Sequence, residues 1–310
     1  MADCSDLFSK FDDSIKLSST KKAHLRSSRN ALRKKLKAKF KEKGYEVKFH
    51  QQGSLAMSTI ITPVDGDYDI DDGCYMQVEE EPKESVETIH QWVVEAVEDH
   101  TSADPIDKDP CVRVIFKAGY HVDLVVYYKL EGQYSRLAHK RDGWIISEPK
   151  EFMDWFEDKV DEDGQLKRIV RYFKGWRDNL RGEMPSGLIF TILATNNFTS
   201  DERDDVAFLE TMKKIKGCLD WHFVCYRPTT PNEDLFAGYS KTRKQYFMEH
   251  LNAFIQSGKQ AIEEPSKKNA CLKWKRHFGE RFPCDDVEDS IEDAKAFTSP
   301  GFIRSDARSA

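Results

Sequence analysis

The sequence lacks the long apolar runs and the paired cysteines that mark membrane proteins and disulfide-stabilised secreted domains. No apolar stretch approaches the ~20 residues that a helix needs to cross a bilayer, and the polar segment Met1 to Lys22 contains no signal-peptide core. The seven cysteines are odd in number and form no C-x-x-C pair, so we expect reduced thiols and no disulfide framework. These absences predict a soluble, cytoplasmic protein that does not associate with a membrane.

The chain also lacks the net positive charge of a general nucleic-acid-binding protein. Its 310 residues carry a net charge of −6, and 39% of them are hydrophobic, which provides a core for two lobes or one large unit. The charge is uneven, because Lys21 to Lys43 is strongly basic whereas Asp285 to Asp293 is strongly acidic. This asymmetry allows a local site for a polyanion on an acidic protein.

Hydrophobic spacing predicts a mixed α/β lobe followed by a helical lobe. The basic segment 20–43 has leucines on one stripe and predicts a long helix capped by Ser19 or Thr20. We interpret its basic faces as solvated, with phosphate binding as the alternative. Strands are expected at 45–50, 67–76, 111–116 and 121–128, and helices at 83–99, 152–160, 165–180, from 185 onward, 203–216, 238–256 and 266–278.

Four acids within six residues of one predicted strand form the most informative pattern. Side chains alternate between the faces of a strand, so Asp69 and Asp71 point the same way, ~7 Å apart. Two such carboxylates repel each other unless a cation lies between them, and Mg²⁺ prefers carboxylates together with substrate phosphates. The pair therefore indicates a magnesium–triphosphate site, whereas Asp65, Asp67 and Asp72 are interpreted as surface or turn residues.

A third acid, Asp123, is the only one in the apolar predicted strand 122–126. A lone carboxylate there is costly to bury without a partner. If this strand lies beside Asp69 and Asp71, the three acids form a two-metal cluster for nucleotidyl transfer. Gly53 and Ser54 fit the same chemistry, since glycine lets the backbone approach a phosphate and serine offers an N–H and a hydroxyl.

The ordered set of these motifs resembles the polymerase-β-like nucleotidyltransferase superfamily. The matching residues are Gln52-Gly53-Ser54, Asp69-Ile70-Asp71-Asp72-Gly73 and His121-Val122-Asp123-Leu124. The flanking motifs are similar to those of the bacterial CD-NTases, the cGAS/DncV-like nucleotidyltransferases of anti-phage (CBASS) signalling. These flanking motifs are Gly143-Trp144, Lys174-Gly175-Trp176, Pro185-Ser186-Gly187 and Pro231-Asn232-Glu233-Asp234-Leu235.

The resemblance implies an α+β fold with a mixed sheet and a long N-terminal spine helix. The expected domains are a catalytic lobe at 1–150, a helical lobe at 151–284 that closes the nucleotide cleft, and an acidic, flexible tail at 285–310. The implied activity is synthesis of a cyclic di- or trinucleotide second messenger from ATP, GTP or other NTPs.

The resemblance also assigns roles to individual residues. Asp69, Asp71 and Asp123 would bind two Mg²⁺ ions, with Mn²⁺ as an alternative. Further residues would contact the nucleotide and its phosphates: Gln52, Gly53, Ser54, Lys174, Ser186 and Arg113. Lys174 is a cation on an otherwise apolar helix face, with a solvated residue as the alternative. Ser186 stands at a helix start, which suits an anion but also suits a simple cap.

Other functions and partners stay open at this point. The three acids fit equally well a template-free nucleotidyltransferase acting on RNA or protein, or one making linear oligoadenylate. A non-catalytic sensor that binds nucleic acid through the basic helix is a third reading, although activation by nucleic acid is not expected. By resemblance, a product-activated effector protein from the same operon is expected, and the C-terminus is a candidate for conjugation or for binding a regulatory partner. Cys218, His222 and Cys225 lack a fourth zinc ligand and are interpreted as core and strand residues.

Overall fold

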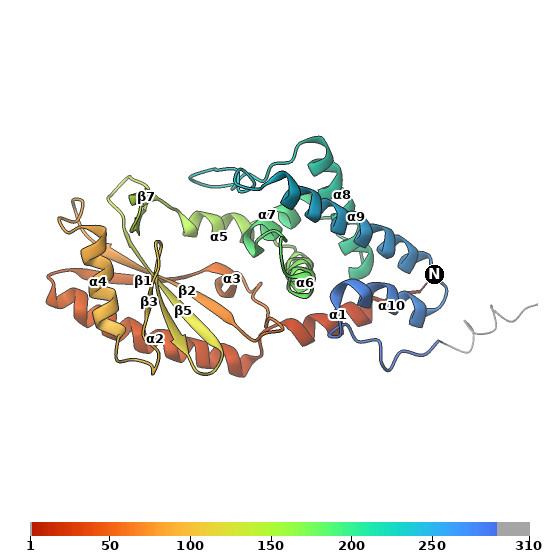
Figure 1. Ribbon diagram of the computed structural model, residues 1–310, viewed down its shortest axis with the longest axis horizontal. Coiled ribbons are helices and arrows are strands. Elements are labelled where there is room, and N and C mark those ends of the chain that lie inside the picture. The colour runs from red at the N-terminus through yellow and green to blue at the C-terminus, as the bar shows by residue number, and fades with distance from the viewer. Residues whose placement is uncertain (1, 290–310) are drawn as a thin grey trace, which may run out of the picture.

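A seven-stranded mixed sheet forms the centre of one lobe in the computed structural model, which describes residues 2–289 (Figure 1). The sheet has the order β1-β2-β5-β4-β3, and β6 pairs with both β5 and β7. Strands β2 and β5 are parallel, and the other pairs are antiparallel. The strands are β1 Glu46–Gln52, β2 Tyr68–Gln77, β3 Ile106–Asp107, β4 Val112–Phe116, β5 Tyr120–Tyr128, β6 Arg136–His139 and β7 Gly143–Ile146. The four expected strands are confirmed, and the short strands β3, β6 and β7 were not expected.

Two helices, α2 (Ser19–Glu42) and α4 (Val86–Val97), cover one face of this sheet. The apolar stripe of α2 is fully buried, as its leucine spacing predicts. The expected cap at Ser19 or Thr20 is wrong by one or two residues, because the Ser18 side chain accepts the Lys21 N–H.

Part of the basic charge of α2 serves the fold rather than solvent. Arg33 donates from Nε to Asp72 at 2.7 Å and pairs with it through a second nitrogen, and Asp72 is fully buried. The interpretation of Asp72 as a surface or turn residue is therefore wrong, because its side chain lies on the α2 side of the sheet while that of its neighbour Asp71 lies on the opposite side.

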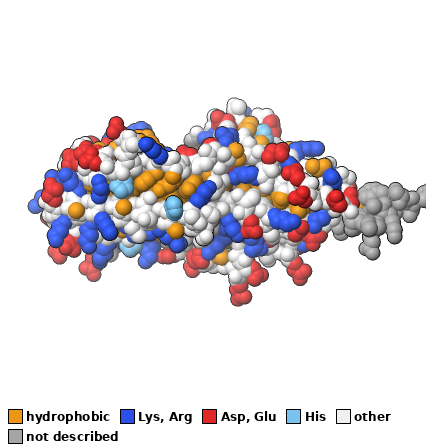
Figure 2. Space-filling model, turned by 90° about the horizontal axis from the view of Figure 1, so that it is seen from below, with side chains coloured by type: hydrophobic (Ala, Val, Ile, Leu, Met, Phe, Trp, Pro, Cys, Tyr) orange, Lys and Arg blue, Asp and Glu red, His pale blue; other side chains and the backbone are white. Residues whose placement is uncertain are grey.

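Figure 2, which views the molecule from the side where α2 lies in Figure 1, shows basic and acidic side chains interspersed around a central hydrophobic area.

Seven helices build the helical lobe within the described residues, and they share one aromatic-rich core. They are α1 Ser5–Ile15, α5 Pro149–Glu157, α6 Gln165–Leu180, α7 Gly187–Asn197, α8 Asp204–Trp221, α9 Lys241–Glu263 and α10 Lys267–Phe278. The helices expected from residue 150 onward are confirmed. Within residues 2–289, no helix combines the length and the apolarity that crossing a membrane requires.

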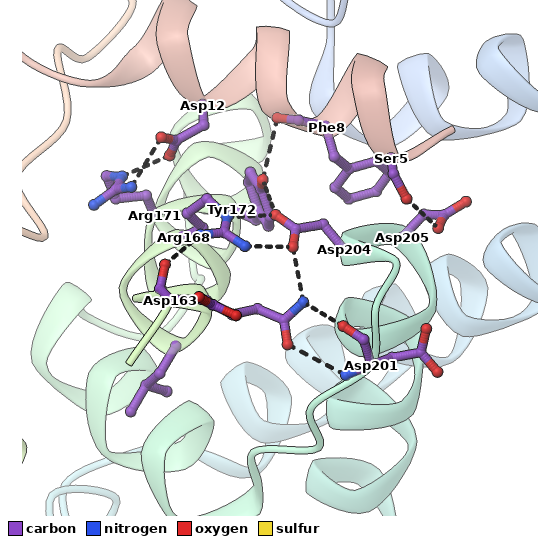
Figure 3. A network of polar contacts seen from close by, with 12 residues as sticks. Ser5, Phe8, Asp12, Asp163, Arg168, Arg171, Tyr172, Asp201, Asp204 and Asp205 are labelled. Atoms are coloured by element: carbon purple, nitrogen blue, oxygen red, sulfur yellow. Dashed lines mark hydrogen bonds and ion pairs between the residues drawn. The ribbon is translucent and has the colours of Figure 1, made fainter. Parts of the chain in front are cut away.

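Helix α1, which was not predicted from the sequence, belongs in space to the helical lobe although it begins the chain (Figure 1). Polar contacts reinforce its packing (Figure 3): Arg171 of α6 donates from Nε to Asp12 at 2.6 Å. The Tyr172 hydroxyl lies 3.1 Å from the Phe8 carbonyl and 2.7 Å from Asp204 of α8. Short α1 is thus held by long-range partners that a local sequence pattern does not contain.

The cysteines differ from the expectation of free thiols at one pair. Cys271 in α10 and Cys284 form a disulfide, while the other five cysteines are free. After this disulfide, Val287 is buried and Asp289 accepts the Ser266 hydroxyl at the start of α10 at 2.8 Å. The rest of the expected acidic tail, residues 290–310, lies outside the described residues.

Candidate active site

The parallel pairing of β2 with β5 brings the predicted acids together on the sheet face opposite α2. Asp71 lies opposite Asp123 in the register, and Asp69 lies opposite His121. Since side chains two residues apart share a face, Asp69, Asp71, His121 and Asp123 all project toward the same side. The expected clustering of the three acids is therefore present in the fold.

A cleft of about 640 Å³ extends from this sheet face to the helical lobe. From the lobe that contains the sheet it is lined by Gln52, Gly53, Ser54, Asp69 and Asp71, and from the helical lobe by Lys174, Arg177, Gly187 and Thr191. The volume suits a nucleotide-sized ligand. Basic side chains from one lobe thus face acidic side chains from the other across the cleft.

The carboxylates form a site of concentrated negative charge. Burial, together with the charges of Asp69 and Asp123, raises the pKa of Asp71 to about 7. Divalent cations relieve such repulsion, so the donor set fits the hard ions expected from the sequence. Three side chains, those of Asp69, His121 and Asp123, form a compact group in which each offers a ligand atom within 4.8 Å of the other two. Asp71 does not join this compact group.

Arg113 on β4 was expected to contact phosphate, and the structure pairs it with Asp123 instead. Its Nε and one terminal nitrogen donate to the two carboxylate oxygens at 2.7 Å each. Arg113 is not among the residues lining the cleft. This bidentate ion pair fixes the orientation of the Asp123 carboxylate and offsets part of its negative charge.

Gly53 begins the short helix α3 (Gly53–Ala56) directly above Asp71. Its φ of +71° is a left-handed conformation, and a Cβ placed on it would lie 2.0 Å from Asp71 Oδ2. Only glycine fits this position, so Gly53 lets the backbone of α3 approach the carboxylate. Its neighbours are placed as expected, since Ser54 lines the cleft and Gln52 accepts a hydrogen bond from the Tyr127 hydroxyl at 3.3 Å.

Lys174 extends from α6 into the cleft and is buried. Its ammonium donates to the carbonyl and hydroxyl oxygens of Thr59, at 3.1 and 3.0 Å. Burial lowers the pKa of Lys174 to about 7, and the charges of Asp69 and Asp71 oppose this effect. The alternative of a solvated helix residue is therefore excluded.

Ser186 does not line the cleft and acts as the N-cap of α7, where its hydroxyl accepts the Ile189 N–H at 3.3 Å. Its phosphate role stays a prediction. Cys218, His222 and Cys225 form no metal-binding group in the described part of the chain, and Cys218 is exposed on α8. The zinc alternative for these residues receives no support from the geometry.

Sequence reasoning missed several polar residues in and around the site, among them His121, Thr59 and Arg177. His121 could have been found, because it stands two residues before Asp123 in the same strand and hence on the same face. Thr59 and Arg177 had no local signal, since the packing of α6 against the segment after α3 brings Thr59 to Lys174 and Arg177 to the cleft.

Comparison with known proteins agrees with this geometry. Residues 47–127 match the sequence model of the nucleotidyltransferase domain of cyclic GMP-AMP synthase DncV-like proteins. A cyclic GMP-AMP synthase of Escherichia albertii is 30% identical over 213 residues, which cover 64% of this chain and 47% of that protein. A cyclic GMP-AMP synthase of Vibrio cholerae is 27% identical over 298 residues, covering 77% of this chain and 68% of that protein. The matched region thus spans about half the length of the Escherichia albertii relative.

Solved structures of Vibrio cholerae DncV have the same fold. One, described as a cyclic AMP-GMP synthase and prokaryotic cGAS homologue, aligns with a TM-score of 0.79 and 19% identity over 90% of this chain and 97% of its own. Another, in complex with the linear intermediate 5′ pppA(3′,5′)pG, aligns with a TM-score of 0.74 and 21% identity over the same 90% and 97% shares. The matched segment 47–127, which carries the acids of β2 and β5, is thus similar to the nucleotidyltransferase domain of DncV-like proteins, and the mixed sheet and helical lobe share the DncV fold.

Proposed function

We propose that this protein is a cyclic oligonucleotide synthase, which joins NTPs into a cyclic di- or trinucleotide by nucleotidyl transfer. The observation that carries the proposal is the convergence of Asp69, Asp71 and Asp123 on one face of the sheet, beside a cleft that Asp69 and Asp71 line and that has Lys174 on its opposite wall. The relatives described as cyclic GMP-AMP synthases favour a cyclic product over a linear one. We further propose that the product serves anti-phage defence by activating an effector protein.

Asp69, Asp71 and Asp123 are the residues that would hold two divalent ions, Mg²⁺ or Mn²⁺. Bound there, the ions would lower the pKa of the attacking hydroxyl and stabilise the leaving pyrophosphate. Asp71 is nearest to the start of α3, so its carboxylate and the α3 backbone would face the same phosphate.

The side chains of this protein orient the reactants. A 2′ or 3′ hydroxyl oxygen of one nucleotide attacks the α-phosphorus of the second, the bond to pyrophosphate breaks, and the hydroxyl proton leaves to solvent. Ser54 and the N–H groups of α3 would hold the donor phosphates, because helix N-termini favour anions. Lys174 would contribute positive charge to the leaving pyrophosphate from the helical lobe. A second transfer within the same site would close the ring.

The test is incubation of the purified protein with all four NTPs and either Mg²⁺ or Mn²⁺, followed by phosphatase treatment and mass spectrometry. A phosphatase-resistant cyclic product, absent with Asp69→Asn, is the expected result and identifies the bases. A linear oligoadenylate, or label transferred only to added RNA or protein, would replace the cyclic proposal with the corresponding alternative. Synthesis that survives Asp69→Asn would contradict the proposed mechanism.

A further inference from the structure

His121 occupies an unusual place for a histidine, between two of the acids proposed to bind metal. It lies opposite Asp69 in the β2–β5 register and two residues before Asp123 on the same strand. Only 6% of His121 is exposed. One of its ring nitrogens, one carboxylate oxygen of Asp69 and one of Asp123 all lie within 4.8 Å of one another. Ligands of a single octahedral ion are separated by about 3 to 4.3 Å, so small rotations would let all three atoms share one ion.

The two ring nitrogens of His121 have different surroundings. Nδ1 lies 2.9 Å from a carboxylate oxygen of Asp67, which is a strong hydrogen-bonding partner. Nε2 is buried, has no hydrogen-bond partner among the described residues, and lies 3.9 Å from Asp69 Oδ2. Leaving a buried polar atom unpaired is costly. The unpaired nitrogen therefore points to a missing partner on the side of Asp69.

We propose that His121 Nε2 is a nitrogen ligand to the divalent ion held by Asp69 and Asp123, and that the site consequently favours Mn²⁺ over Mg²⁺. This proposal rests on the metal site of the proposed function but not on the identity of the product. Asp67 plays the part of the carboxylate that commonly accepts the other ring N–H of a metal-binding histidine. That contact fixes the tautomer and makes Nε2 more basic.

The preference for manganese follows from ligand chemistry. Mg²⁺ is a hard ion that takes oxygen ligands and keeps several waters. Imidazole nitrogen suits first-row transition ions better, and Mn²⁺ belongs to that series although it also takes oxygen ligands. Replacing one oxygen by the His121 nitrogen in a carboxylate site therefore costs Mg²⁺ more than Mn²⁺.

The test is pulsed electron paramagnetic resonance of the full chain with Mn²⁺ and inorganic tripolyphosphate, which occupies phosphate positions without adding nitrogen. Nitrogen directly bonded to Mn²⁺ produces ¹⁴N modulation of the electron spin echo, and labelling with ¹⁵N-histidine identifies its source. We expect modulation that changes with the label, is lost in His121→Gln, and persists in the control His24→Gln, whose side chain is exposed on α2. We also expect Mn²⁺ affinity to fall by at least about tenfold in His121→Gln, with Mg²⁺ affinity changing much less.

Bound Mn²⁺ with no histidine modulation in the wild type, or modulation that survives in His121→Gln, would overturn the proposal. If His121→Gln does not fold, Asp67→Asn provides a second route, because it should weaken Mn²⁺ binding about 10- to 100-fold while keeping the ¹⁵N-histidine signal. Unchanged affinity in Asp67→Asn would also count against the proposal. An ion coordinated by histidine, without any nucleotide product, would leave this inference intact and refute the proposed function. A cyclic product made with an ion that has only oxygen ligands would support the proposed function and refute this inference.

Discussion

Lys174 of α6 and Thr59, which follows α3, join the two lobes at the back of the cleft through two hydrogen bonds of 3.1 and 3.0 Å. A lysine in such a buried position has lost most of its hydration, and within residues 2–289 Thr59 alone replaces the lost water by hydrogen bonds. Holding a cation there is unfavourable for folding but places it opposite the acids of β2. A residue whose charge lowers the stability of the fold and whose pKa is strongly shifted is typical of a functional site.

Lys174→Met should therefore stabilise the protein and weaken substrate binding. The pKa of Lys174 is lowered to about 7 in the fold, so burying the side chain costs least above pH 10.5, where it is neutral in both the folded and the unfolded state. The stability that this neutral form allows is lost as the pH falls through about 7. The gain in melting temperature over the wild type should therefore grow between pH 10 and pH 7 and then level off. KM for NTPs should rise about tenfold, equivalent to ~1.4 kcal/mol.

Lys167→Met is the matched control, since Lys167 lies on the same helix and pairs with Glu157 at the surface. Thermal melts from pH 6 to pH 10 and steady-state kinetics separate the two variants. A Lys174→Met protein that melts lower than Lys167→Met at pH 7 would contradict the conclusion that burying the charge of Lys174 destabilises the fold.

Asp71→Asn should abolish synthesis and yet raise the stability of the metal-free protein. The pKa of Asp71 is raised to about 7 in the fold, so its contribution to stability is fully present at acidic pH below 3.8 and is lost as pH rises through about 7. The neutral amide removes this loss. The variant should melt higher than the wild type at pH 8, by roughly 2–4 °C per kcal/mol gained, with little difference at pH 4.

Differential scanning fluorimetry with excess EDTA measures this effect, and Asp104→Asn on an exposed loop provides a control for charge removal. Adding Mn²⁺ should raise the melting temperature of the wild type more than that of Asp71→Asn. Equal metal responses in the two proteins would remove Asp71 from the metal site.

Gly53→Ala should disturb the site through backbone geometry alone. The added methyl group would meet Asp71 Oδ2 at 2.0 Å, and φ of +71° is unfavourable for alanine. We expect a loss of about 1–3 kcal/mol in unfolding free energy and a fall in kcat of roughly 100-fold, as α3 moves away from the phosphates.

Gly66→Ala is a close control, because Gly66 has a similar φ of +80° but no atom of the described residues within 4 Å of the added methyl. Both variants carry the conformational strain, and only Gly53→Ala carries the clash. If the two variants lost the same activity, strain rather than the contact with Asp71 would explain the effect.

The sequence was sufficient for the parts of the fold whose signals are local. The leucine stripe of α2, the apolar strand β5 and the amphipathic α6 were predicted because each repeats with the period of its secondary structure. The three acids were predicted because a carboxylate in an apolar strand is chemically conspicuous. Helix α1 was missed although Leu7, Phe8, Phe11 and Ile15 recur at helical spacing, because the helix is short and its packing partners in α6 and α8 lie far along the chain.

The sequence was insufficient where partners are distant along the chain. Arg113 has no neighbour in sequence that indicates its pairing with Asp123, which depends on the β4–β5 register. Asp72 was misplaced for the same reason, since its partner Arg33 lies 39 residues earlier. His121 stood within a recognised motif, but its value as a ligand emerges only from the contacts of its two ring nitrogens.

Arg33→Met should destabilise the protein strongly, because it would leave Asp72 charged and fully buried without a partner. Removing one member of a buried ion pair typically costs about 3–5 kcal/mol. Asp72→Asn should cost less, since Arg33 is partly exposed and can turn toward solvent. Adding Asp72→Asn to Arg33→Met should therefore recover part of the stability, which chemical denaturation of the single and double variants measures. Lys34→Met, at an exposed position of α2, controls for the loss of one positive charge. A double variant less stable than Arg33→Met would show that the buried charge of Asp72 is not the source of the cost.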